Sequence, residues 1–143
     1  MNTRMALKLT LAGASRILEG ALREAKGRQQ EISVAIVDEG GHLIAFARTD
    51  RAELQTILIA ENKARSAALA GIPTGRKSKA GNEGSDHHLL AITLAAGTNN
   101  FVTVQGGVPI IVDGQCIGGV AVSGAAHADG EIAQAGASLV SAS

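Results

Sequence analysis

The side chains best suited to acid-base or ligand chemistry in this sequence are four histidines, His42, His87, His88 and His127. No two of them stand four residues apart on a common helix, and none has a companion cysteine, so no metal site is predicted. His87 and His88 are consecutive, and consecutive helix side chains point about 100° apart. We therefore expect one to face a cleft or subunit contact, where it can act as a general base, and the other to face solvent. The alternative is that both are polar surface residues at a helix start.

Two basic residues are candidates for binding an anionic group. Arg48 ends a strand-like run and is followed by Thr49 and Asp50, where a loop meets the next helix. Its guanidinium can bind a carboxylate through two parallel hydrogen bonds, or it can pair internally with Asp50 or Glu53. Lys63 lies in an otherwise apolar helix and either binds an anion or belongs to a solvated helix face.

Backbone and hydroxyl groups complete the candidate ligand-binding set. Gly106 and Gly107 precede a strand and leave room for a ligand or another backbone to approach their N–H groups. They form neither a dinucleotide fingerprint nor a phosphate loop. Ser123 is followed by Gly124 and, further on, by His127, but the residues around it do not form the nucleophile elbow of a hydrolase. We predict ligand contacts for Arg48, Asp50, Lys63, Gly106, Gly107, Ser123 and His127.

Composition excludes several classes of partner. The 143 residues carry 13 Lys and Arg against 13 Asp and Glu, so no global field attracts a phosphate backbone or an anionic membrane. Two Phe and no Trp or Tyr leave no aromatic platform for bases. We expect no nucleic-acid or membrane partner and aliphatic walls for any apolar ligand. One cysteine, Cys116, and the lack of a signal peptide or long apolar run predict a cytoplasmic protein.

Hydrophobic periodicity and turn residues predict one domain, spanning residues 1–143, in the order α-β-β-α-α-β-β-β-α. Asp113 and Gly114 between apolar runs are a strong hairpin signal. Tight hairpins favour an antiparallel sheet, and strands this apolar predict helices on both faces. The fold class is therefore α+β, with a five-stranded antiparallel sheet. Helices are expected at Thr3 to Lys26, Glu53 to Ala70, Asp86 to Ala96 and Asp129 to Ala137 or beyond. Strands are expected at Ile32 to Val37, His42 to Arg48, Phe101 to Val104, Val108 to Val112 and Gln115 to Val122.

Two stretches resemble one known family. They are Val34 to Asp50, running on into Ile59 to Ala64, and Gly106 to Gly114, running on through Ile117 to Gly124. These motifs are similar to those of the GlcG/HbpS family, which includes the C-terminal domain of PduO. The resemblance implies a profilin-like α/β/α sandwich and a homo-oligomer, and it implies that haem is a candidate cofactor. It carries no axial ligand of the family onto a residue of this chain, and one of His87 and His88 is the candidate for that role. A D/E-x-x-E iron pattern can be matched only to Asp50 and Glu53.

The leading functional hypothesis is a cytoplasmic homo-oligomer that binds haem, another tetrapyrrole or a small anionic ligand. Its pocket is expected between the loop at Arg48, the helix with Lys63, the turn at Gly106 and the segment Ser123 to His127. The alternative is a cofactor-free enzyme, namely a lyase, tautomerase, dehalogenase or deaminase acting on a small unsaturated carboxylate. There Arg48 would grip the carboxylate, and His87 or His88 would move the proton. A third hypothesis is an oligomeric scaffold without a ligand.

Overall fold

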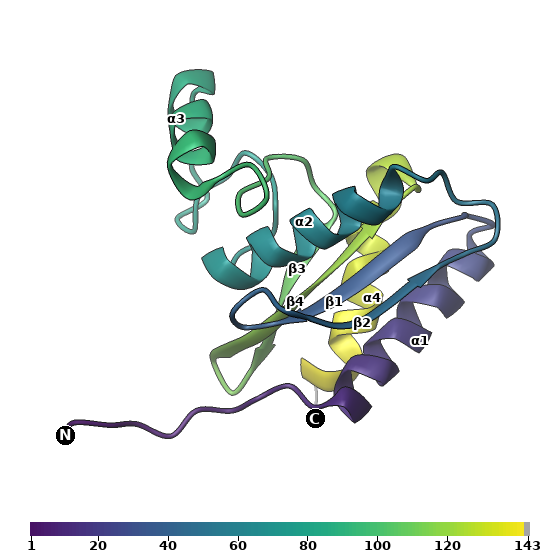
Figure 1. Ribbon diagram of the computed structural model, residues 1–143, viewed down its shortest axis with the longest axis horizontal. Coiled ribbons are helices and arrows are strands. Elements are labelled where there is room, and N and C mark those ends of the chain that lie inside the picture. The colour runs from purple at the N-terminus through teal and green to yellow at the C-terminus, as the bar shows by residue number, and fades with distance from the viewer. Residues whose placement is uncertain (142–143) are drawn as a thin grey trace.

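Two hairpins form the sheet of this protein, seen here in a computed structural model that describes residues 1–141 (Figure 1). The first joins β1 (Ser33–Asp38) to β2 (Leu43–Arg48), and the second joins β3 (Gly107–Val112) to β4 (Gln115–Ser123). β1 also pairs with β4, so the order is β2-β1-β4-β3 and every pairing is antiparallel. The turn between β3 and β4 is the predicted one: Asp113 and Gly114 both have positive φ, at 49° and 74°.

The prediction of five strands was wrong, because the described chain has four. The segment Phe101 to Val104, expected as a strand, is irregular. The backbone N–H of Val102 donates to the hydroxyl of Ser66 on a neighbouring helix, at 3.0 Å. A strand would have needed that group for its sheet ladder. This contact holds the segment beside the helix, so β3 remains an edge of the sheet.

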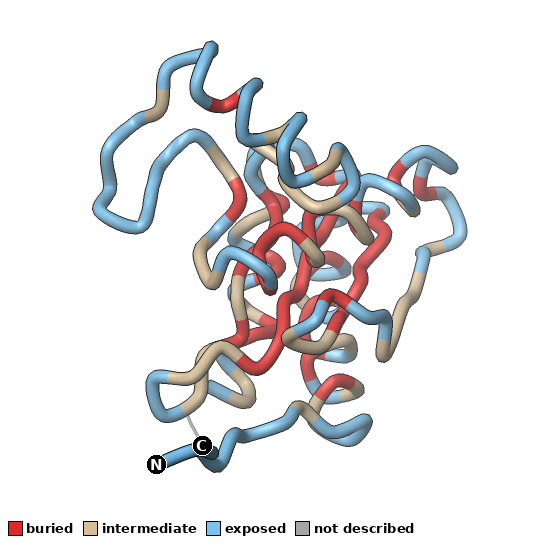
Figure 2. The backbone as a smooth tube through the Cα atoms, turned by 60° about the vertical axis from the view of Figure 1, so that its left-hand side comes forward, coloured by how far each residue is buried: buried red, intermediate tan, exposed pale blue. Residues whose placement is uncertain are grey.

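Helices cover both faces of the sheet, as predicted. α1 (Leu11–Gly27) and α4 (Asp129–Ser141) pack together on one face, and α2 (Thr56–Ala70) lies on the other. Successive side chains of a strand point to opposite faces of the sheet, so each strand packs against the helices on both faces. Figure 2 shows the sheet as the most buried part of the chain. Val34 and Ile36 face α1 and α4, whereas Ala35 and Val37 face α2.

Two helix starts differ from the sequence prediction. α1 begins at Leu11 and not at Thr3, because the hydroxyl of Thr10 accepts from the N–H of Gly13 at 3.0 Å and caps the helix. α2 begins at Thr56, whose hydroxyl donates to the carbonyl of Glu53, the residue at which the helix was expected to start. A 3-10 turn, η1 (Ala126–Ala128), precedes α4.

Helix α3 (Asp86–Ala96) has the bounds predicted for it, with Ser85 accepting from the N–H of His88 and Gly97 at its C-cap. It stands away from the sandwich, above the end of α2 in Figure 1. Leu89 is its one buried residue, at 8% exposure. The irregular segment 72–85 connects α2 to α3.

Backbone contact between α2 and the sheet depends on glycines. A Cβ on Gly119 of β4 would overlap the carbonyl oxygen of Ala64. A Cβ on Gly107 of β3 would clash in the same way with the carbonyl of Lys63. The small residues of α2 that face the sheet, including Ala60, Ala64 and Ala68, complete this close approach.

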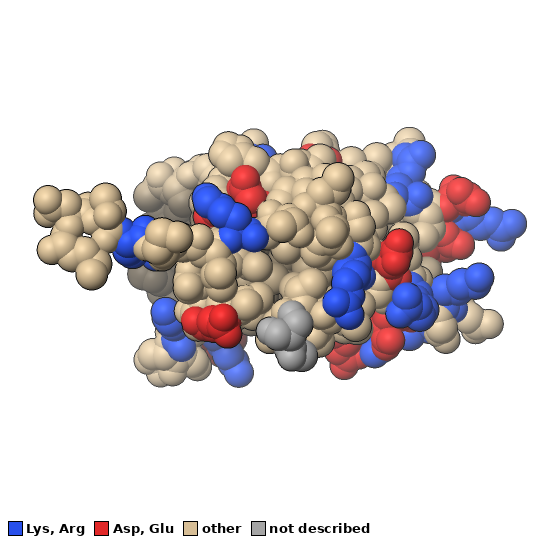
Figure 3. Space-filling model, turned by 90° about the horizontal axis from the view of Figure 1, so that it is seen from below, with Lys and Arg blue, Asp and Glu red and all other residues tan. Residues whose placement is uncertain are grey.

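The molecular surface carries interspersed charges. On the face shown in Figure 3, basic and acidic side chains alternate without a patch of a single sign. None of the helices in the described part of the chain is both long and apolar enough to cross a membrane.

We predict that Gly119→Ala lowers the free energy of unfolding by about 1–3 kcal/mol, the usual cost of overpacking a dense core. Urea denaturation measures the change. Gly27→Ala is the control, because nothing lies within 4 Å of a Cβ at that helix-end position. Equal stability of the two variants would contradict direct contact of α2 with the sheet backbone.

Candidate functional site

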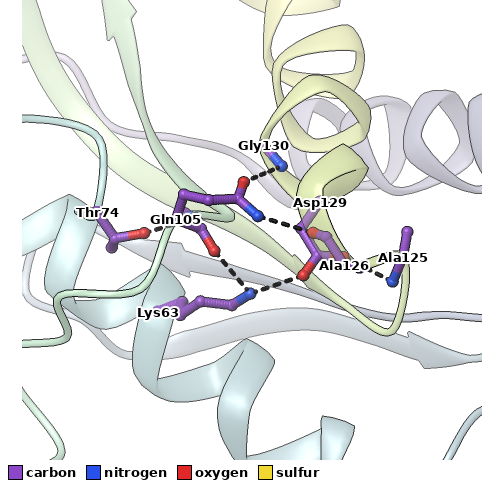
Figure 4. A network of polar contacts seen from close by, with 8 residues as sticks. Lys63, Thr74, Gln105, Ala125, Ala126, Asp129 and Gly130 are labelled. Carbon is purple, nitrogen blue, oxygen red and sulfur yellow. Dashed lines mark hydrogen bonds and ion pairs between the residues drawn. The ribbon is translucent and has the colours of Figure 1, made fainter.

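A buried ion pair joins α2 to the start of α4 (Figure 4). The side chain of Lys63 is 1% exposed, and its Nζ donates to Asp129 Oδ2 at 3.2 Å and to the carbonyl of Gln105 at 3.1 Å. Asp129 Oδ1 accepts from the backbone N–H of Ala125 at 2.7 Å. Asp129, predicted to cap the last helix, instead serves as the first residue of α4 and as the counterion of Lys63.

The segment before β3 is fastened to the same network. Gln105 Nε2 donates to the carbonyl of Ala126 at 2.7 Å, and its Oε1 accepts from the N–H of Gly130 at 2.9 Å. Thr74 Oγ1 accepts from the N–H of Gly107. Gly106 has φ +129°, and a Cβ there would meet the Lys63 ammonium, so only glycine fits.

The charge of Lys63 is met inside the protein. Burial lowers the pKa of this lysine, and the attraction of Asp129 opposes that shift. Two adjoining cavities near α3 are described below, and Lys63 lines neither of them. The contacts seen for Lys63, Gly106 and Gly107 thus link secondary-structure elements to one another.

The side chains of the other residues predicted to contact a ligand take no part in the hydrogen bonds of this network. Arg48 is exposed at the end of edge strand β2, and none of the ion pairs of residues 1–141 includes it. Asp50 is exposed and lines a hollow next to α1, together with Lys26. Ser123 is buried at the end of β4, and His127 is exposed in η1.

A cavity of about 280 Å³ lies between the end of α2, the segment 72–84 and α3, and we call it the α3 cavity. His88 lines it, whereas His87 does not, so the two consecutive side chains diverge as helix geometry requires. Ser66 contributes a hydroxyl at its α2 side. The apolar part of its lining comprises Ala70, Ile72, Pro73, Leu89, Ile92, Phe101 and Val102.

Three basic residues of the connecting segment also line the α3 cavity, and one of them, Arg76, is already paired with carboxylates of the protein. Arg76 Nη2 donates to Asp86 Oδ1 at 2.6 Å and to the carbonyl of Gly84 at 3.1 Å, and its Nε lies 3.5 Å from Glu83. Lys77 and Lys79 enter none of the ion pairs of the described chain. Apolar walls beside free ammonium groups suit an amphipathic anion.

An adjoining cavity of about 590 Å³ shares the segment Ile72 to Lys79 with the α3 cavity. None of the ligand contacts predicted from the sequence falls in that segment. Its basic cluster close before His88 was the available signal. Within residues 1–141 no three His, Cys, Asp or Glu side chains gather as a metal site would require.

We predict that Asp129→Asn lowers the free energy of unfolding by about 3–5 kcal/mol, because it leaves a buried ammonium without its counterion. Adding Lys63→Met should restore part of the loss, since the double variant buries no charge. Chemical denaturation of the two single variants and the double variant measures the coupling.

Glu131→Gln is the control for this cycle, because it breaks the exposed pair between Arg28 and Glu131, which solvent screens, and should change stability little. A loss for Asp129→Asn no larger than the control's would refute the buried-charge account.

Comparison with known proteins fits this architecture. A family model described as "Haem degrading protein HbpS-like" matches residues 9–138. Protein GlcG of Escherichia coli strain K12 is 35% identical over 123 residues, covering 86% of this chain and 85% of the relative.

Solved structures agree with the same assignment. Klebsiella pneumoniae protein ORFY superposes with a TM-score of 0.83 at 27% identity, over 100% of this chain and 98% of that one. The complex of PduOC with haem has a TM-score of 0.74 at 24% identity, over 94% and 96% of the two chains, a likeness of fold. With a family match over most of its length and a relative at 35% identity, this chain belongs to the HbpS-like family.

Proposed function

We propose that this protein binds an amphipathic small molecule with carboxylate groups in the α3 cavity, and that haem is the leading candidate ligand. The observation that carries the proposal is the cavity itself, where apolar walls, one histidine and two unpaired lysines meet. Membership of a family described as haem degrading supports haem in particular.

The residues of the α3 cavity fit the chemistry of haem. His88 would supply an imidazole to the iron, Lys77 and Lys79 would pair with the two propionates, and Leu89, Ile92 and Phe101 would contact the ring. Haem, when bound, supplies redox and oxygen chemistry. The α3 cavity alone, at about 280 Å³, is slightly smaller than the usual ligand pocket of about 300–1,000 Å³, so a tetrapyrrole would extend toward the adjoining cavity. A smaller anionic ligand fits the α3 cavity without that extension.

The alternative of a cofactor-free enzyme receives no such support. It requires Arg48 and a histidine at one ligand, and Arg48 does not line the α3 cavity. Residue roles for Arg48, Asp50 and His127 remain predictions from the sequence. The lone Cys116, whose Sγ lies 3.5 Å from the carbonyl of Ala68, keeps the cytoplasm as the proposed location.

We predict that haemin titration gives a saturating Soret change at one haem per chain. His88→Ala should weaken binding by about tenfold or more and shift the Soret maximum, because the iron loses its imidazole. His87→Ala, its neighbour outside the cavity, is the matched control and should bind as the native chain does.

A parallel thermal-shift screen of small dicarboxylates distinguishes the ligand classes. If only dicarboxylates stabilise the protein, and Lys77→Ala abolishes that stabilisation, the ligand of the α3 cavity is a smaller anion and not haem. Equal haemin binding by both histidine variants would remove His88 from the site.

We also propose that the protein is a homo-oligomer whose contacts include α3. An isolated helix of this length is marginal in water, and α3 leaves Leu90 and Leu94 exposed at 60% and 69%. Leu58, on the outer face of α2, is exposed at 66%. Apolar surface of this kind marks an interaction site.

Sedimentation velocity at micromolar concentration should accordingly show a species larger than the 14.4 kDa monomer. Leu94→Glu should shift the distribution toward the monomer, because it places a charge in the apolar contact. Leu11→Glu changes a residue of similar exposure, 66%, on the first turn of α1 and should leave the distribution unchanged. A native chain that sediments as a monomer would refute the assembly.

A further inference from the structure

A separate cavity, of about 510 Å³, lies at the end of the sheet where β1 begins and β4 ends. The first turns of α2 and α4 meet there as well. We call it the polar cavity, because most of its lining is polar. The residues used in the argument are Thr56, Ser123 and Asp129, all buried, and Glu31, Arg51 and Glu53, all exposed.

Ser123 is the feature of the polar cavity that the fold does not explain. Its residue is 94% buried, at 6% exposure, yet its hydroxyl makes none of the hydrogen bonds found among residues 1–141. Ser33 is its cross-strand partner, so both side chains leave the sheet on the same face. Ser33 Oγ bonds Thr56 Oγ1 at 2.8 Å, which shows that this face looks toward the start of α2. Ser123 therefore presents a hydroxyl that has no hydrogen-bond partner within residues 1–141 to the cavity that it lines.

The charges around the polar cavity favour a cation over an anion. The ion pair with Lys63 neutralises Asp129, so this carboxylate adds no net charge to the lining of the cavity. Two carboxylates, those of Glu31 and Glu53, line the cavity together with one guanidinium, that of Arg51, which leaves a negative excess. A hydrogen bond from the Thr49 hydroxyl, with a second from the N–H of Arg51, lowers the pKa of Glu31 and keeps this carboxyl ionised.

We propose that the polar cavity binds a small hydroxylated amine. Its hydroxyl group pairs with Ser123, and the carboxylates of Glu31 and Glu53 attract its ammonium group. This binding is independent of the α3 cavity and of any ligand there, because the two cavities share no lining residue.

Three probes with one carbon skeleton test the charge preference: serinol, which is cationic, glycerol, which is neutral, and glycerate, which is anionic. Isothermal titration calorimetry at neutral pH and constant ionic strength should give a dissociation constant for serinol about tenfold below that of glycerol, with glycerate weaker still. Glycerate binding as tightly as serinol would overturn the proposal. So would the lack of saturable serinol binding.

Ser123→Ala tests the site and separates a binding role from a structural one. It should weaken serinol about tenfold while leaving the stability of the ligand-free protein unchanged or raised, because the native hydroxyl has no partner to lose. Ser138→Ala, on the exposed side of α4, is the matched control. His88→Ala should leave serinol affinity unchanged, so failure at one cavity does not imply failure at the other. Unchanged serinol affinity in Ser123→Ala would place the ligand elsewhere and refute the proposal.

Discussion

Direct contact between the backbone of α2 and the sheet is the constraint on which the rest of this structure depends. Glycines at 107 and 119 bring the helix so close that the stem of Lys63 is enclosed as soon as α2 docks. An enclosed ammonium needs a counterion, which fixes Asp129, and with it the first turn of α4, against α2. The carbonyl of Gln105 accepts a hydrogen bond from the same ammonium, and this contact fixes the position of the segment that leads into β3.

Much of this arrangement follows from local sequence, and the part that does not is tertiary. Caps at Ser85 and Gly97 and the turn at Asp113 are decided within a few residues, so the bounds of α3 and the second hairpin could be predicted. Val102 has the residue type of a strand, but Ser66, 36 positions away, takes its N–H. Lys63 and Asp129 lie 66 residues apart, and no spacing rule connects them. Local sequence likewise does not determine which of His87 and His88 faces a cavity, because the cavity is formed by the irregular segment that precedes α3.

The two ends of α2 offer surfaces of different chemistry for one physical reason. At its start, the sheet presents the ends of β1 and β4, where hydroxyls and carboxylates meet the first turns of two helices. At its end, the chain leaves the sheet altogether, and Ile72 lines a cavity together with apolar residues of α3. Polar side chains gather at the start of α2, where the first N–H groups of two helices lack partners within the helix. Apolar side chains gather at its end, where α3 stands away from the sheet and depends on side-chain packing.

The α3 cavity differs from the polar cavity in what holds its walls. Sheet strands and the ends of two helices frame the polar cavity, whereas one wall of the α3 cavity is a short helix held by Leu89 and by the contacts of Arg76. A helix so weakly attached gains order from anything that covers its outer face. A second copy of the chain on Leu90 and Leu94 would therefore stiffen the same helix that carries His88. Assembly and occupancy of the α3 cavity would then be linked, each strengthening the other by the same free energy.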